Sequence, residues 1–158
     1  MPMSILDQPG TLFASSASSG ANALEGLPEW NLADLYPSMD SPDLSEDMEN
    51  AAKAAVEFEK SWKGKLSAEA AKGSDGKLGA ALQAYESLEE LIGRIASYAG
   101  LVYASDTSDP ARAKFYGDVQ EKMTDASAHL LFFALELNTI DDEEISAALN
   151  ADPDFGHY

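Results

Sequence analysis

The feature that most constrains the fold is an apolar stripe that runs through residues 110–138. Asp109 followed by Pro110 is a strong helix start, because the aspartate accepts free N–H groups of the first turn and proline at the first helical position loses no hydrogen bond. Beyond this start, apolar residues recur at steps of three and four: Phe115, Val119, Met123, Ala126, Leu130, Phe133 and Leu137. The spacing predicts one continuous helix from Pro110 to Asn138, about 40 Å long.

Two other stretches show the same helical period. Ser41 and Pro42 repeat the cap-and-proline start and predict a first long helix that ends at Gly64. Its apolar stripe is Leu44, Met48, Ala51 or Ala52, Ala55, Phe58 and Trp62. Residues 77–103 predict a second long helix. Its stripe is Leu78, Leu82, Tyr85, Leu88, Leu91 or Ile92, Ile95, Tyr98 or Ala99, and Val102. Between the two helices, residues 66–76 fit either a short helical turn or a loop.

The remaining segments complete an all-α fold of antiparallel helical hairpins with an extended N-terminal strap. Residues 1–26 are rich in Ser, Ala and Gly and are expected to form a flexible, disordered tail. Residues 27–37 are expected to lie across the helices as the strap, with Trp30 buried as an anchor. Asp141 and Glu144 resemble a capping box and predict a short fourth helix. Asp152 followed by Pro153 is another helix start close to Tyr158, so we expect the helical region 27–158 to be truncated.

The charge balance restricts the partners of the chain. Its 28 acidic and 10 basic residues give a net charge of −18, and such a surface repels nucleic acid and anionic lipid. A solvated acidic exterior is the preferred interpretation, and attraction of basic peptides or adaptation to high salt are the alternatives. The sequence has no cysteine, so disulfides and thiolate metal sites are excluded. The first basic residue is Lys53, which argues against a secretory signal, and no apolar run could span a bilayer; the cytoplasm is the expected location.

No residue pattern indicates a catalytic, cofactor-binding or metal site. His129 and Glu136 are two turns apart on one predicted helix, but two ligands are too few for zinc. The acidic cluster near Ser41 lacks the spacing of a calcium loop and is typical of a helix start. GSDGK lacks the spacing of a phosphate-binding loop. Arg94 is expected to pair with Glu90 one turn away. Gly79, Gly93 and Gly100 are expected to allow close helix packing.

Several segments, taken in order, resemble a known family. These are LPEWNLADLYPSMDSPDL near the N-terminus, then YAGLVYASDTSDPARAKFYGDVQEKMTDASAHLLFFALELNTIDDEEISAAL. Together they look like the N-terminal region of the oligoendopeptidase F-like (M3 family) zinc metallopeptidases. The resemblance covers about residues 27–158, and it is the order and spacing of the pieces that make it specific.

The resemblance implies the front part of an all-helical hydrolase that cuts short peptides inside a deep channel. In that family a zinc ion is held by a His-Glu-x-x-His helix and a later Glu, in a C-terminal catalytic domain. Here His129 is followed by Leu-Leu-Phe-Phe and His157 is the penultimate residue, so neither opens this motif. No catalytic or metal residue can be carried over. The expected partners are the missing C-terminal catalytic domain and short peptides.

Two alternatives belong to other classes. One is a free-standing acidic helical module that binds other proteins without catalysis. The other, a four-helix-bundle metal enzyme, fails because Glu-x-x-His ligand pairs are missing. If the chain is the front part of a peptidase, it should be inactive by itself. It should also expose apolar surface near Phe132 and Phe133, where the helices are apolar on both sides.

Overall fold

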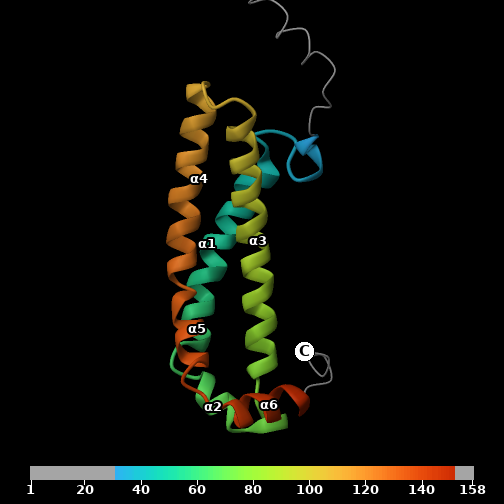
Figure 1. Cartoon of the computed structure of the whole chain (residues 1–158), viewed down its shortest axis with the longest axis vertical. Coiled ribbons are helices and arrows are strands. Elements are labelled where there is room, and N and C mark those ends of the chain that lie inside the picture. Colours follow the sequence, from blue (N-terminus) through green and yellow to red (C-terminus); the bar gives the residue numbers. More distant parts are fainter. Residues whose placement is uncertain (1–30, 152–158) are drawn as a thin grey trace, which may run out of the picture. The chain divides into compact units, whose positions relative to one another are not determined.

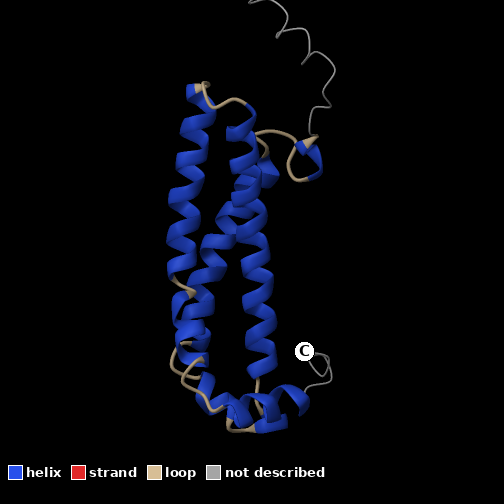
Figure 2. Cartoon of the chain, in the orientation of Figure 1, coloured by secondary structure: helices blue, strands red, loops and turns tan. Residues whose placement is uncertain are grey.

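The structure is a computed structural model that describes residues 31–151. The expected tail, Trp30 and the Asp152–Pro153 start signal lie outside the described residues. Figure 2 shows that residues 31–151 form helices and connecting loops without a strand, which confirms the all-α prediction. In chain order the elements are η1 (Leu32–Asp34), α1 (Pro42–Trp62), α2 (Leu66–Ala70), η2 (Gly73–Asp75), α3 (Leu78–Ser105), α4 (Pro110–Ala128), α5 (Leu131–Leu137) and α6 (Asp142–Ala151).

Three long helices form the body of the region that begins at Leu32. Helix α3 packs along both α1 and α4, and α1 also contacts α4. Figure 1 shows α3 running in the opposite direction to both neighbours, as the predicted hairpins require. Helix α2 contacts α3 and α5, and α6 contacts η2, α2 and α3, so these short helices close one end of the three-helix body.

Both predicted proline starts are confirmed at the level of hydrogen bonds. The Ser41 hydroxyl accepts from the Leu44 amide at 3.3 Å at the start of α1. The Asp109 carboxylate accepts from the Ala111 amide at 2.8 Å at the start of α4. At the other end of α1, Gly64 adopts a φ of 76°, a left-handed conformation that suits a residue just past a helix end. Local sequence chemistry therefore fixes where α1 and α4 begin and where α1 ends.

An aromatic cluster fills the core where α1, α3 and α5 meet. The rings of Tyr85 and Phe133 stack with centroids 4.5 Å apart, and Phe58 lies 5.4 Å from Phe133 and 5.6 Å from Phe132. Phe133 is 1% exposed. The stripe predicted for residues 110–138 does face the core, because Val119, Met123, Ala126, Leu130 and Phe133 are all buried.

The prediction of one continuous helix from Pro110 to Asn138 is wrong. Helix α4 ends at Ala128, and α5 begins at Leu131. At the break, the His129 amide donates to the Ala126 carbonyl at 3.1 Å and the Leu130 amide donates to the Ser127 carbonyl at 2.9 Å. These bonds span three residues instead of four, so the backbone is wound more tightly here. Contacts to distant residues on α1 stabilise the break, as described below.

The expectation for the glycines of α3 is only partly met. A Cβ at Gly93 would meet nothing within 4 Å, so no helix approaches there and the close-packing expectation is wrong for this residue. Gly79 is buried, and a Cβ at Gly100 would lie 4.0 Å from the Tyr116 ring. The close approach is instead at Gly76, before α3, where a Cβ would lie 2.0 Å from the Glu69 carbonyl oxygen.

Candidate functional site

A polar network anchors the segment before α1 to the helices. The Tyr36 hydroxyl donates to the Asp47 carboxylate at 2.7 Å, and Arg94 Nε donates to that hydroxyl at 3.2 Å. Arg94 Nη2 lies 2.5 Å from Asp47 Oδ2, and the guanidinium carbon lies 5.5 Å from the Tyr36 ring centroid. The Tyr98 ring meets the Tyr36 ring edge-on at 5.2 Å. Tyr36 is 3% exposed and anchors this segment against the helices.

This network corrects the expectation that Arg94 pairs with Glu90. Arg94 reaches across to α1 because Asp47 and the Tyr36 hydroxyl together offer it two acceptors, which an exposed neighbour on α3 cannot match. Burial raises the pKa of Tyr36 above its ordinary value, and the hydrogen bond to Asp47 raises it further. The tyrosine therefore stays protonated at neutral pH and acts as a structural donor.

His129 lies at the break between α4 and α5 and pairs with α1. Its Nδ1 is 2.5 Å from Glu59 Oε2, and Glu59 also binds Lys63 Nζ at 2.6 Å. The hydrogen bond with His129, followed by that with Lys63, lowers the pKa of the Glu59 carboxyl. Glu136 has a different partner, since its carboxylate accepts from the Gly64 amide at 2.7 Å. Each of these two sequence candidates thus bonds to the end of α1.

These pairs have limited chemistry. Within residues 31–151, no three His, Asp or Glu side chains come close enough together to hold a metal ion. His129 has one carboxylate partner, and no serine is hydrogen-bonded to it in this part of the chain. The arrangement joins helices, and it lacks the nucleophile, base and third orienting group of a hydrolytic site. The described residues do not fit a zinc ion, so no step of peptide hydrolysis is assigned to any of them.

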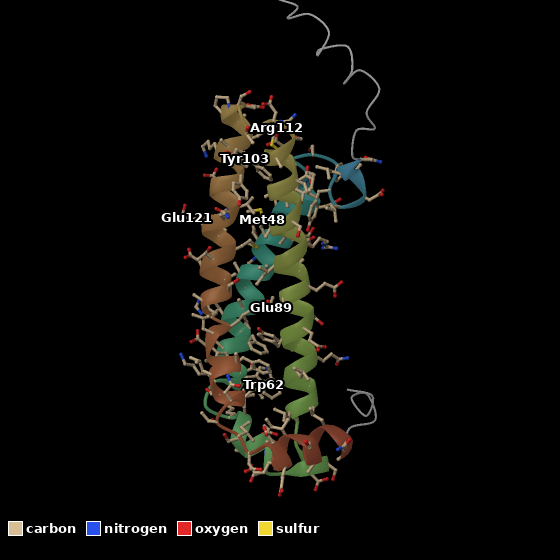
Figure 3. The ribbon with its side chains drawn as sticks, in the orientation of Figure 1. Met48, Trp62, Glu89, Tyr103, Arg112 and Glu121 are labelled. Atoms are coloured by element: carbon tan, nitrogen blue, oxygen red, sulfur yellow. The ribbon has the colours of Figure 1, made fainter. Side chains whose placement is uncertain are left out.

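Two grooves open between the long helices. One of about 390 Å³ lies between α1 and α3, and Trp62, labelled in Figure 3, is among its lining residues. Another of about 300 Å³ lies between α1 and α4 and is lined by Met48, Val56, Lys122 and His129 among others. Sequence reasoning missed both grooves. The available signal was the set of small residues at helical spacing, Ala54, Ser61, Ala84 and Ser87, which line the first groove.

The outer face of α5 is the most exposed apolar part of the described chain. Leu131 is 66% exposed and Leu135 is 68% exposed. They are four residues apart and so lie one helical turn from each other on the same side of α5. Phe132 and Phe133 between them are buried, so α5 is apolar on both its inner and its outer side. This is the exposed apolar surface that the sequence predicts near the two phenylalanines.

Among residues 31–151, no helix combines the length and the hydropathy that a bilayer span needs.

Charged residues at the turn between α3 and α4 make short-range hydrogen bonds. Arg112, labelled in Figure 3, contacts the Ser105 hydroxyl and donates to the Val102 carbonyl at 3.3 Å, beside the stacked rings of Tyr103 and Tyr116.

Comparison with known proteins adds no relative. The chain matches no model of a protein family, and neither the curated proteins nor the solved structures contain a match to it. The likeness to oligoendopeptidases therefore depends on the quoted segments of the sequence and remains a prediction.

Proposed function

We propose that this chain forms the helical N-terminal part of an oligoendopeptidase F-like zinc peptidase. In this role it contributes to the wall or lid of the peptide channel, while a catalytic part with a His-Glu-x-x-His helix holds the zinc and cuts the peptide. The proposal begins from the ordered sequence resemblance over residues 27–158. It agrees with a described region that is helical.

The observation that carries the proposal is the outer face of α5. Leu131 and Leu135 belong to the LLFFALELN segment, which is part of the resemblance. Both side chains remain about two-thirds exposed although the neighbouring phenylalanines are fully used in the core. Burying one leucine side chain stabilises a protein by about 1.5–3 kcal/mol, so a covering partner would gain substantially from this pair. The catalytic part of the same enzyme is the partner that the resemblance supplies.

The first test is the coding sequence that follows the codon for Tyr158. The proposal expects an open reading frame that reaches a His-Glu-x-x-His helix. The 158-residue chain should then show no hydrolysis of short fluorogenic peptides with zinc added, whereas the longer protein should show hydrolysis that a chelator abolishes. A stop codon at this position, or chelator-sensitive hydrolysis by the 158-residue chain itself, would overturn the proposal.

A second test addresses the exposed outer face of α5. In the longer protein, Leu131→Asp combined with Leu135→Asp should weaken the interface between the helical and catalytic parts. The thermal unfolding temperature and the peptidase activity should both fall. Ala111→Asp combined with Ala113→Asp adds the same charge to exposed positions of α4 and should change neither. Equal effects of the two double variants would show that charge alone matters and that α5 is not covered.

A second candidate function is a helical protein-interaction module without catalysis. The groove between α1 and α3 favours it, because small side chains leave an apolar floor accessible. The two candidates differ in the reading frame: a stop after Tyr158, together with a monomer that melts cooperatively, supports the module.

A further inference from the structure

The groove between α1 and α3 has the surface of a helix-binding site. Its volume is about 390 Å³, and it is lined by Ala54, Glu57, Phe58, Ser61, Trp62, Ala84, Ser87, Leu88 and Leu91. All of these residues come from α1 or α3 and none from α4, which packs elsewhere on the same two helices. The groove therefore runs between α1 and α3, and α4 does not cover it.

The shape of the groove follows from where small and large side chains occur. Ala54 and Ser61 are seven residues apart on α1, and Ala84 and Ser87 are three apart on α3, so each pair shares one helix face. These small side chains make low walls. The floor is formed by larger apolar groups, with Phe58 and Leu88 each 5% exposed and Trp62 and Leu91 half-buried. Amphipathic helices bind grooves of this kind through apolar residues spaced three or four apart.

The charges around the groove specify the flanks of such a helix. A neighbouring hollow of about 260 Å³ shares Ser87 and Leu91 and adds Glu90 and Arg94. Arg94 is already neutralised by Asp47. Glu57 has only an exposed ion pair with Lys60, which is a weak interaction. Glu90 has no hydrogen-bond or ion-pair partner within residues 31–151, so its carboxylate can meet a cation from outside.

We infer that the α1–α3 groove docks an amphipathic helix of another protein segment, with apolar residues against Phe58, Trp62, Leu88 and Leu91 and with Lys or Arg on its flanks. Apolar contact supplies the affinity, while the acidic rim and the net charge of −18 favour a basic occupant over an acidic one. This inference does not depend on the peptidase proposal, which concerns α5 and the reading frame.

The experiment uses Trp62 as a reporter inside the groove. The chain has two tryptophans, so Trp30→Phe leaves Trp62 as the sole source of tryptophan fluorescence. The probe is a synthetic helical peptide with Leu at positions i, i+3, i+7 and Lys on both sides of this stripe. A saturable change of Trp62 emission is expected on titration. A peptide of the same composition with a scrambled order, which lacks the apolar face, should bind at least about tenfold more weakly.

Two matched variants separate the groove from the overall charge. Ala84→Arg places a long cation inside the groove at an exposed helical position and should weaken binding of the probe at least about tenfold. Ala113→Arg makes the same change on α4, outside the groove, and should leave the dissociation constant within about twofold. Circular dichroism checks that both variants keep their helices. Glu90→Gln should weaken binding by a few-fold and reduce its dependence on salt.

Three results would overturn the inference. Equal weakening by Ala84→Arg and Ala113→Arg would mean that the probe responds to net charge alone. Equal affinity for a peptide whose flanks carry Glu in place of Lys would show that the groove does not prefer a basic helix. Sedimentation that shows a dimer of the chain, broken by Ala84→Arg, would assign the groove to a second copy.

Discussion

The Tyr36 network and helix α5 differ in how many of their side chains find partners within the described residues. Around Tyr36, the buried ring packs on Tyr98 and the hydroxyl bonds to Asp47 and Arg94, so both apolar and polar groups have partners within the described residues. In α5 the inner side is equally complete, with Phe133 stacked on Tyr85. The outer side is not, because Leu131 and Leu135 remain exposed. The contacts of the first region are thus made within the fold, whereas the second presents the exposed apolar surface on which the proposed function depends.

The largest expected effect comes from removing a buried side chain on the inner side of α5. Phe133→Ala removes a ring that is 1% exposed and stacked on Tyr85, and it should lower the free energy of unfolding by about 3–5 kcal/mol. Leu135→Ala, on the outer side of the same helix, should change it by no more than about 0.5 kcal/mol in the isolated chain. Urea unfolding of both variants measures the contrast, and similar losses would show that the outer side is already covered.

The next effect tests whether the anchor depends on its hydroxyl. Tyr36→Phe keeps the ring against Tyr98 but removes the hydrogen bonds with Asp47 and Arg94, which should cost about 1–2 kcal/mol of unfolding free energy. Tyr103→Phe is the matched control, because the Tyr103 ring stacks on Tyr116 and its hydroxyl makes no hydrogen bond within residues 31–151. A loss as large in Tyr103→Phe as in Tyr36→Phe would contradict the role given to the network.

A stabilising change is expected one residue before Arg94. Gly93→Ala adds a methyl group at an exposed position of α3 where nothing lies within 4 Å, so the gain in helix propensity should raise the unfolding free energy by about 0.8–1 kcal/mol. Gly76→Ala should do the reverse, since its Cβ would lie 2.0 Å from the Glu69 carbonyl oxygen. Thermal unfolding should therefore move in opposite directions for these two variants. A lower melting temperature for Gly93→Ala would mean that a helix does approach it.

Features with a local cause could be predicted from the sequence, and features that depend on distant residues could not. The starts at Ser41 and Asp109 were predictable, because a cap side chain bonds to an amide two or three residues away. The break at His129 was not, because the apolar stripe continues through it while the bond to Glu59 comes from 70 residues earlier. Arg94 was assigned the neighbouring Glu90 for the same reason, since Asp47 is 47 residues away in sequence.

The candidate sites show the same contrast between local and distant causes. Exposed apolar surface near Phe132 and Phe133 was predicted, because apolar residues on two sides of one helix are visible in a single segment; which leucines would be exposed was not. The α1–α3 groove was not, because it requires Ala54 and Ser61 to face Ala84 and Ser87 across two helices. Small residues at helical spacing are visible in the sequence, but only the packing of α1 on α3 shows that the two sets share one furrow.

The smallest expected effect concerns the pH dependence of the bond that ties His129 to α1. The pKa of Glu59 is lowered in the folded chain by His129 and Lys63, so protons bind the unfolded chain more readily. The contribution of Glu59 to stability is therefore present above its ordinary pKa of 4.5 and is lost as the pH falls through the lower folded value. Glu59→Gln removes this contribution. Wild type should exceed the variant in unfolding free energy at pH 6–7, with the gap closing below about pH 4.5.

Glu121→Gln controls for the loss of one negative charge, because Glu121 points away from the helices on α4 and has no ion pair within residues 31–151 (Figure 3). Its unfolding free energy near neutral pH should match that of the wild type within about 0.5 kcal/mol. The decisive quantity is the difference between wild type and Glu59→Gln across the acid range. A difference that grows as the pH falls below about 4.5 would mean that Glu59 is held in its protonated form. The contact with His129 would then not be the bond that joins α1 to the break before α5.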